Sequence, residues 1–253
     1  KRDNMKAAVL SDIHGNLEAL KAVLEDAKKE KADRIFICGD LAMAGPQPSE
    51  TVDFLRKLSE EEDVTFIQGN TDEMIVKAVG ADREKYTPPN KIMANALVYA
   101  QEVLSDSQKE FLSELPFAHT ETIGQIDVLF VHGSPRRNNE DILPNQPVDK
   151  IKEIIQDADE DLIFCGHTHM PAGYQLENQT VVNAGSVGRP FSEEPKACYV
   201  IFNYPDLKKS EYEIVHKFVD YDVASAVEKL KKQPFEGSEA LAHMLEKATS
   251  RYP

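Results

Sequence analysis

The 253-residue sequence has little cysteine, no long apolar run and a deficit of positive charge, and each absence excludes a class of protein. Three cysteines, an odd number without a Cys-x-x-Cys pair, argue against a disulfide framework. No apolar run approaches the roughly 20 residues that span a bilayer. The amino terminus leads directly into a predicted strand, with Met5 as a candidate natural start. We therefore expect a cytoplasmic protein without a membrane partner.

The charge balance bears on possible ligands. The chain carries 29 Lys and Arg against 44 Asp and Glu, a formal net charge of −15. Long nucleic acid is disfavoured, because its binding depends on clustered basic residues that release counterions from the phosphates. A small phosphorylated substrate or nucleotide remains compatible, since bound metal ions can attract phosphate locally whatever the charge of the whole chain.

Five short apolar runs end abruptly in residues that bind metals. We interpret these runs as buried strands, because each is rich in branched residues and is closed by Gly or a polar residue: Ala7 to Ser11, Ile35 to Cys38, Val64 to Gln68, Val128 to Val131 and Leu162 to Cys165. The polar residues that follow them are Asp12, His14, Asp40, Asn70, His132, His167 and His169. Ligands bind beyond the carboxyl ends of such strands, so these side chains are expected to converge on a metal site.

The order of elements predicts an α/β fold. Helices capped by Asn16 and Ser49 separate the first three strands, which indicates βαβ units with parallel strands. The later part of the chain predicts largely antiparallel hairpins, with strands at Tyr174 to Leu176, Thr180 to Val182, Ala197 to Asn203 and Glu211 to Val219. We expect one domain over residues 1–253, with a helical insertion at 73–118 near the mouth of the site and a helical appendage at 220–253.

Taken together, the motifs Asp12-Ile13-His14, Gly39-Asp40, Gly69-Asn70, His132-Gly133 and Gly166-His167-Thr168-His169 resemble those of the calcineurin-like metallophosphoesterase superfamily. The stretch from Asn183 to Gly188 resembles the segment that closes the site in its small bacterial and archaeal phosphodiesterase branch. The resemblance implies a layered β-sandwich with flanking helices. It also implies that Asp12, His14 and His169 hold one metal ion, that Asn70, His132 and His167 hold a second, and that Asp40 bridges both.

The chemistry of these side chains is consistent with such a site. A carboxylate between two divalent ions can place one oxygen on each and offset their repulsion, which suits Asp40. Imidazole ligands favour transition metals, so we expect two such ions, with Mn preferred and Fe, Zn, Ni or Co possible. The expected reaction is phosphoester hydrolysis by metal-activated hydroxide, with Asp40, Asn70 and His132 as catalytic residues.

The sequence departs from the family pattern after Asn70. Many members carry a His there that can protonate the leaving oxygen, whereas this chain has Thr71, a poor acid near neutrality. We therefore expect a preference for leaving groups of low pKa. Thr71, Arg136 and Arg189 are candidates for binding the substrate phosphate, although solvated loop charge explains the two arginines equally well.

Several functions fit these residues. The favoured hypothesis is a dinuclear metal-dependent phosphoesterase acting on a phosphodiester or small nucleotide. A phosphomonoesterase, including a protein Ser/Thr phosphatase, and a symmetrical dinucleoside polyphosphate hydrolase are alternative enzymes, because ligand residues alone do not distinguish these substrates. A non-catalytic protein-binding scaffold of the same fold is an alternative of a different class. The intact set of ligand residues argues against it.

Overall fold

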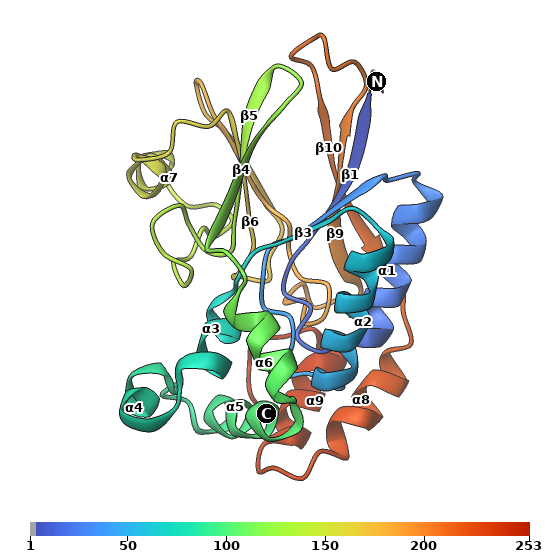
Figure 1. The fold of residues 1–253 in the computed structure, drawn as a ribbon, viewed down its shortest axis with the longest axis vertical. Helices are drawn as coiled ribbons and strands as arrows, with labels where there is room; N and C mark the ends of the chain where they lie inside the picture. The colour runs from blue at the N-terminus through green and yellow to red at the C-terminus, as the bar shows by residue number, and fades with distance from the viewer. Residues whose placement is uncertain (1–3) are drawn as a thin grey trace.

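The computed structural model describes residues 4–253 and contains two five-stranded sheets (Figure 1). Met5, the candidate natural start, is the first residue of strand β1, while residues 1–3 lie outside the described part of the chain. The first sheet has the order β10-β9-β1-β2-β3. Its strands are β1 Met5–Leu10, β2 Arg34–Ile37, β3 Val64–Phe66, β9 Ala197–Tyr204 and β10 Glu213–Val219. The βαβ prediction is confirmed here, because β1, β2 and β3 pair in parallel.

The second sheet has the order β4-β5-β6-β8-β7. Its strands are β4 Ala118–Ile123, β5 Ile126–Val131, β6 Leu162–Cys165, β7 Ala172–Gln175 and β8 Thr180–Asn183. As predicted, β7 pairs with β8 and β9 pairs with β10 in antiparallel hairpins. The central strands β5, β6 and β8 are parallel to one another. Both sheets are therefore mixed, which the predicted α/β sandwich allows.

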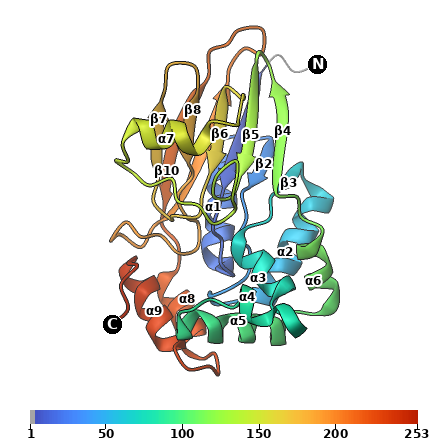
Figure 2. The same cartoon turned by 90° about the vertical axis from the view of Figure 1, so that its left-hand side faces the viewer.

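The helices lie on the outer faces of the sheets and at one end of the molecule. They are α1 Leu17–Lys29, α2 Pro48–Glu61, α3 Asn70–Lys77, α4 Arg83–Tyr86, α5 Lys91–Val103, α6 Asp106–Ser113, α7 Val148–Ile155, α8 Val223–Lys231 and α9 Ser238–Lys247, with a 3-10 turn at Gly80–Asp82. In Figure 2 the strands extend upward from a group formed by α3 to α6, α8 and α9. β1 runs down toward this group, so its carboxyl end meets the helical end of the molecule.

A core between the two sheets holds the layers together. Phe36 of the first sheet stacks on Phe130 of the second, with ring centroids 3.9 Å apart, and Phe130 stacks on Phe164 at 5.3 Å. Other apolar side chains pack the outer faces: residues of α1 and α2 lie against the first sheet, and Ile151 and Ile154 of α7 lie against the second. The sandwich thus consists of two sheets covered by helices.

Some predicted element boundaries are wrong. The structure contains β4, a strand that the sequence did not suggest, and the short helix α4. Helix α2 begins at Pro48 rather than after a Ser49 cap, because proline fits the first helical turn. Helix α3 begins at Asn70 itself, ahead of the helical insertion predicted at 73–118. Asn16 does cap α1, where its side chain accepts a hydrogen bond from the backbone N–H of Ala19. The division into a domain, an insertion and an appendage stays a prediction.

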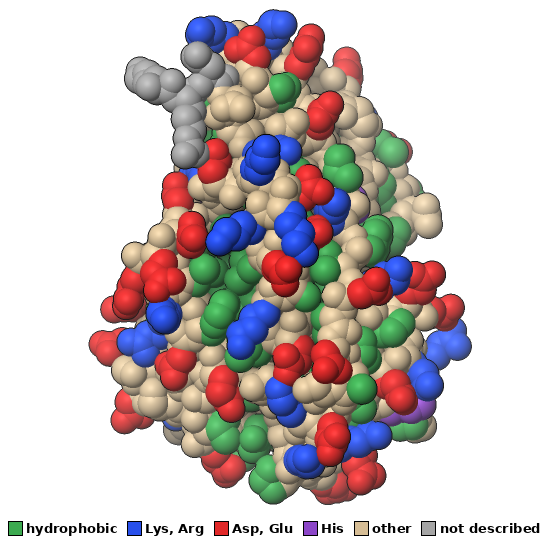
Figure 3. All heavy atoms as spheres, turned by 90° about the vertical axis from the view of Figure 1, so that its right-hand side faces the viewer, with side chains coloured by type: hydrophobic (Ala, Val, Ile, Leu, Met, Phe, Trp, Pro, Cys, Tyr) green, Lys and Arg blue, Asp and Glu red, His purple; other side chains and the backbone are tan. Residues whose placement is uncertain are grey.

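The surface carries charges of both signs. Figure 3 shows acidic and basic side chains interspersed over the face formed by α1, α2 and α8. Within residues 4–253 the structure has no helix that is both long and apolar enough to cross a membrane.

Candidate metal centre

The seven predicted ligands follow the carboxyl ends of strands from both sheets. Asp12 and His14 follow β1 and Asp40 follows β2, while Asn70 opens α3 after β3. The remaining three ligands, His132, His167 and His169, follow β5 and β6 of the second sheet. Ligand atoms of Asp12, His14 and His169 lie within 4.8 Å of one another, and so do those of Asp12, Asp40 and His132. Five predicted ligands thus converge in two groups that share Asp12.

Backbone strain is concentrated at these positions. Ten non-glycine residues in the described chain have a positive φ angle, and half of them are predicted ligands: Asp12, His14, Asp40, His167 and His169. An L-residue in the left-handed region costs free energy and persists only where the surrounding structure enforces it. Such outliers are typical of functional sites, because the strained turn aims a side chain that a relaxed one would not.

Three histidine rings are oriented by backbone carbonyl groups. The Nδ1 atoms of His14, His132 and His169 lie 2.7, 2.6 and 2.5 Å from the carbonyl oxygens of Met43, Cys38 and Arg189. A carbonyl oxygen can only accept, so each Nδ1–H donates. In the neutral ring the lone pair then lies on Nε2, which points into the cluster in all three residues. Neutral imidazole presented in this way is the form that binds a metal ion.

The cluster has the donor set of a cation site. The Nε2 atoms of His14 and His169 lie only 3.1 Å apart, although both rings direct their Nδ1–H elsewhere. Asp12 Oδ1 is buried, has no hydrogen-bond partner and lies 3.2 Å from His169 Nε2. Lone pairs held this close repel unless a cation lies between them. The residues present therefore fit a divalent transition metal, which accepts both imidazole and carboxylate.

The second group lies around Asp40 and His132. His132 Nε2 lies 3.4 Å from Asp40 Oδ2 and 3.0 Å from Asn70 Oδ1, so three of the residues expected at the second ion are adjacent. The fourth, His167, is oriented differently: its Nε2 lies 3.3 Å from Asp141 Oδ1. The ring nitrogen of His167 that does not face Asp141 is Nδ1. The rings of His132 and His167 meet edge to face with centroids 5.3 Å apart.

The buried charges polarise one another. Burial opposes ionisation of Asp12 and Asp40, but the neighbouring histidines outweigh it and hold the pKa of both carboxyl groups below the ordinary value. Burial likewise disfavours a charged ring at His132, yet Asp40 and Asp12 raise its pKa to about 10. Without a metal ion, the two carboxylates thus draw a proton onto His132. A divalent ion would displace that proton, because metal ligands bind deprotonated.

Asp72 holds two ligand loops together. Its carboxylate accepts hydrogen bonds from the backbone N–H groups of Asp40, Leu41 and Gly69, at 2.8 to 2.9 Å. Burial and the nearby Asp40 raise the pKa of Asp72 to about 7, against the effect of these hydrogen bonds. The structure shows that Asp72 connects the loops after β2 and β3.

Two glycines are required by close packing at the site. A Cβ atom on Gly69 would lie 2.1 Å from Asp40 Oδ1, and one on Gly166 would lie 1.9 Å from Ser11 Oγ and 2.6 Å from Asp12 Oδ2. Real Cβ contacts are not this short, so a side chain at either position would displace a ligand carboxylate. The two glycines therefore allow the backbone to approach the ligand carboxylates closely.

The three predicted substrate-binding residues lie in different environments. Arg136 pairs with Glu140 at 2.7 Å and with Glu153 at 3.4 Å, so its guanidinium is already engaged. Arg189 is buried, with only 8% of its surface exposed. The backbone N–H of Thr71 donates to Asp40 Oδ1 at 2.9 Å, while its hydroxyl oxygen is buried without a partner. Whether each residue binds substrate stays a prediction.

Sequence reasoning missed two residues that support the ligands. Ser11 donates its hydroxyl to Asp12 Oδ2 at 2.7 Å, which leaves Oδ1 free to face the cluster. Asp141 lies beside His167, in the long loop between β5 and α7. Ser11 was identifiable only by its place directly before Asp12. Asp141 carries no sequence signal, because it lies nine positions beyond His132 in an irregular loop.

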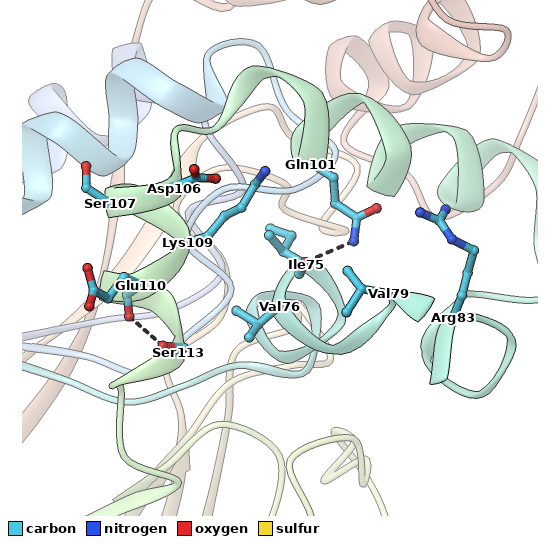
Figure 4. Close-up of a pocket in the computed structure, with 10 residues that line it drawn as sticks. All are labelled: Ile75, Val76, Val79, Arg83, Gln101, Asp106, Ser107, Lys109, Glu110 and Ser113. Carbon is cyan, nitrogen blue, oxygen red and sulfur yellow. Dashed lines mark hydrogen bonds between the residues drawn. The ribbon is translucent and has the colours of Figure 1, made fainter. Parts of the chain in front are cut away.

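A separate hollow of about 640 Å³ lies between α3, α5 and α6 (Figure 4). None of the predicted site residues lines it, and its basic side chains Arg83 and Lys109 are accompanied by the acidic Asp106 and Glu110. Gln101 of α5 projects toward the last turn of α3, where its amide donates to the carbonyl groups of Ile75 and Ala78. This contact braces the helix that presents Asn70.

Comparisons with known proteins agree with the geometry. Residues 5–206 match the profile of the calcineurin-like phosphoesterase superfamily domain, and the chain belongs to that superfamily. An uncharacterized protein of Methanocaldococcus jannaschii is 34% identical over 242 residues, which cover 89% of this chain and 91% of the relative.

Two solved structures share the fold over nearly their whole length. A metallophosphoesterase from Sphaerobacter thermophilus has a TM-score of 0.76 at 26% identity. The aligned region covers 96% of this chain and 99% of that chain. A hypothetical protein from Pyrococcus horikoshii has a TM-score of 0.82 at 25% identity. The aligned region covers 95% of this chain and 97% of that chain. The predicted family and the layered sandwich are thereby confirmed.

Proposed function

We propose that the protein is a dinuclear metal-dependent phosphoesterase that hydrolyses a phosphodiester or small nucleotide. The observation that carries this proposal is the convergence of the buried carboxylates Asp12 and Asp40 with the Nε2 atoms of His14, His132 and His169. Membership of the calcineurin-like phosphoesterase superfamily supports it. When bound, two divalent ions would activate water as the nucleophile and stabilise the negative charge that develops on phosphorus. Manganese is our favoured metal, with Fe, Zn, Ni or Co as alternatives.

The chain's own residues would hold the ions and favour an anionic substrate. Asp40 Oδ2 lies 3.4 Å from Nε2 of both His14 and His132, which supports the proposal that this carboxylate would serve both ions. Backbone carbonyl partners orient His14, His132 and His169 so that Nε2 of each ring faces the site. Asn70 offers an amide oxygen next to His132 without adding negative charge. Two carboxylates against two dications leave a formal excess of positive charge, which favours an anionic phosphoester as the substrate.

The leaving group distinguishes the possible substrates. Thr71 occupies the position after Asn70, and its hydroxyl is too weak an acid to protonate an alkoxide efficiently near neutrality. We therefore propose that the enzyme favours esters with good leaving groups. A diester is preferred over a monoester because the resemblance to the small phosphodiesterase branch extends to the segment from Asn183 to Gly188.

The test compares bis(p-nitrophenyl) phosphate with p-nitrophenyl phosphate. Metal-stripped protein is reconstituted with Mn²⁺ and assayed alongside Asp40→Asn. A matched control is Asp127→Asn, since Asp127 is exposed on β5 and pairs with Thr122 rather than with the site. We expect diester turnover in wild type and in the control, and none in Asp40→Asn.

Other results would redirect the assignment. Turnover of the monoester alone would favour a phosphomonoesterase. Absence of turnover with Mn²⁺, Fe²⁺, Zn²⁺, Ni²⁺ and Co²⁺ would contradict the enzymatic proposal and favour a non-catalytic protein-binding scaffold.

A further inference from the structure

Arg189 is a buried cation without a carboxylate partner. Its residue surface is 8% exposed, and the one hydrogen bond that its guanidinium makes to a residue in the range 4–253 runs from Nη1 to the thioether sulfur of Met93, at 3.9 Å. The guanidinium carbon lies 5.8 Å from the ring centroid of Phe191. In the part of the chain that the structure describes, no Asp or Glu oxygen lies within ion-pair distance of the guanidinium. Burying a charge without a partner is costly, so an unpaired buried arginine requires a reason.

The backbone of Arg189 is fixed to the metal ligands at two points. Its carbonyl oxygen accepts the Nδ1–H of His169 at 2.5 Å. Its N–H donates to Ser186 Oγ at 2.8 Å, and Ser186 Oγ donates to the carbonyl oxygen of Asp12, also at 2.8 Å. The Cα of Arg189 is therefore held directly beside the ligand group of Asp12, His14 and His169.

The surroundings of the side chain limit where the guanidinium can point. Phe191 stacks on the ring of His169, with centroids 4.4 Å apart and planes at 18°, so it fills the space on that side. Met93 of α5 closes another side. Burial lowers the pKa of Arg189, while the charges of Tyr252, Asp40 and Asp12 act in the opposite direction. The guanidinium thus lies within the electrostatic influence of the two carboxylates that the proposed metal ions would neutralise.

We propose that Arg189 binds a nonbridging oxygen of the substrate's phosphoryl group on the His169 side of the metal centre. This inference rests on the proposed function. Bound metal ions would neutralise the carboxylates of Asp12 and Asp40. The positive charge of Arg189 would then have no compensating anion until a phosphoester binds. The planar guanidinium suits an oxyanion that presents two oxygens. Arg136 is the less favoured of the two arginines, because its guanidinium already pairs with Glu140 and Glu153.

The first test measures binding of inorganic phosphate to the Mn²⁺-loaded protein by titration calorimetry, with no turnover required. We expect Arg189→Met to weaken phosphate binding about 10- to 100-fold, since a hydrogen bond to a charged group contributes that much. Arg189→Lys keeps the positive charge but loses the paired N–H donors of the planar guanidinium, so we expect its loss of phosphate affinity to be intermediate. Arg56→Gln is the matched control, because Arg56 lies on α2 with 40% of its side chain exposed, and it should bind phosphate as wild type does. Metal content, measured by elemental analysis, should stay unchanged in all variants.

The second test separates binding from a structural role. If Arg189 serves the ligand, Arg189→Met removes an unpaired buried charge, so the melting temperature without phosphate should stay equal or rise. Added phosphate should then stabilise wild type but not the variant. A lower melting temperature in Arg189→Met with unchanged phosphate affinity would assign the residue a structural role and overturn the inference.

The two proposals can fail independently. Diester turnover in wild type combined with Arg189-independent phosphate binding would overturn this inference and leave the phosphoesterase in place. Arg189-dependent phosphate binding without turnover of any ester would retain the anion site and contradict the enzymatic function.

Discussion

At the scale of single residues, Asp72 is the strongest candidate for a support that is not itself a ligand. Asp72→Ala would leave the buried N–H groups of Asp40, Leu41 and Gly69 without an acceptor. Each unsatisfied group costs about 1 to 3 kcal/mol, so we expect a loss of about 3 kcal/mol or more in the free energy of unfolding. Urea denaturation measures this loss.

An exposed aspartate provides the control for the stability measurement on Asp72→Ala. Asp53 lies on α2 with 65% of its side chain exposed, and Asp53→Ala should change stability by less than about 0.5 kcal/mol. Equal stability of Asp72→Ala and Asp53→Ala would show that the three hydrogen bonds do not matter. Metal affinity should also fall in Asp72→Ala alone, because the loop that carries Asp40 loses its anchor.

Asp141 should act through His167. Its carboxylate lies 3.3 Å from His167 Nε2, which orients the ring and leaves Nδ1 for a metal ion. Loss of such an outer contact commonly weakens metal binding about 10- to 100-fold. We expect Asp141→Asn to weaken one of two metal-binding events by this factor in a Mn²⁺ titration. The exposed Asp157→Asn serves as the control, and an Asp141→Asn titration that matches it would remove Asp141 from the site.

The sequence predicted the ligand side chains of the site, but not the backbone groups that orient them. All seven predicted ligands follow the expected strands, because a ligand must have a particular side chain and therefore leaves a motif. The groups that orient the histidine rings are backbone carbonyls of Met43, Cys38 and Arg189. Any residue type supplies a carbonyl, so no pattern in the sequence could have revealed these contacts.

At the scale of elements, the loop between β5 and α7 combines an ion pair with the residue that contacts His167. Arg136 and the hydroxyl of Ser134 hold the pKa of Glu140 down to about 2, against the effect of its partial burial. A lowered pKa in the folded state stabilises the protein above the unfolded pKa of 4.5, and this stability is lost as pH falls from 4.5 toward about 2.

We therefore expect Glu140→Gln to be destabilised by about 1 kcal/mol at pH 7, since solvent and salt screen an accessible pair. The difference from wild type should shrink as pH falls below 4.5. Urea titrations of both proteins at pH 7, 5 and 4 measure it. A difference that is constant across these pH values would contradict the ion-pair explanation.

The elements that the sequence failed to predict share a physical cause. β4 lies at the edge of its sheet and only Ile123 is fully buried, so its sequence lacks the apolar pattern of a central strand. Its register comes from pairing with β5, which is a tertiary contact. The central strands β1, β5 and β6 were predicted because burial on both faces forces a continuous apolar run.

At the scale of the whole molecule, the candidate metal centre lies where loops of the two sheets meet. Asp12, His14 and Asp40 lie in loops that follow strands of the first sheet, whereas His132, His167 and His169 lie in loops that follow strands of the second. The aromatic stack of Phe36, Phe130 and Phe164 connects the same sheets in the middle of the sandwich. An ion that binds only the folded chain should therefore stabilise the molecule as a whole and not just the ligand loops.

This connection predicts the effect of metal removal. Mn²⁺ at 100 times its dissociation constant should add about 2.7 kcal/mol per site, which corresponds to a rise of roughly 5 to 10 °C in the melting temperature for a chain of this size. Chelation by EDTA should reverse the rise, and Asp40→Asn should show little of it while Asp127→Asn behaves as wild type. Hydrogen exchange should slow in the ligand loops of both sheets when Mn²⁺ binds. Slower exchange confined to the loops of one sheet would mean that the ion organises only half of the centre and does not bridge the sandwich.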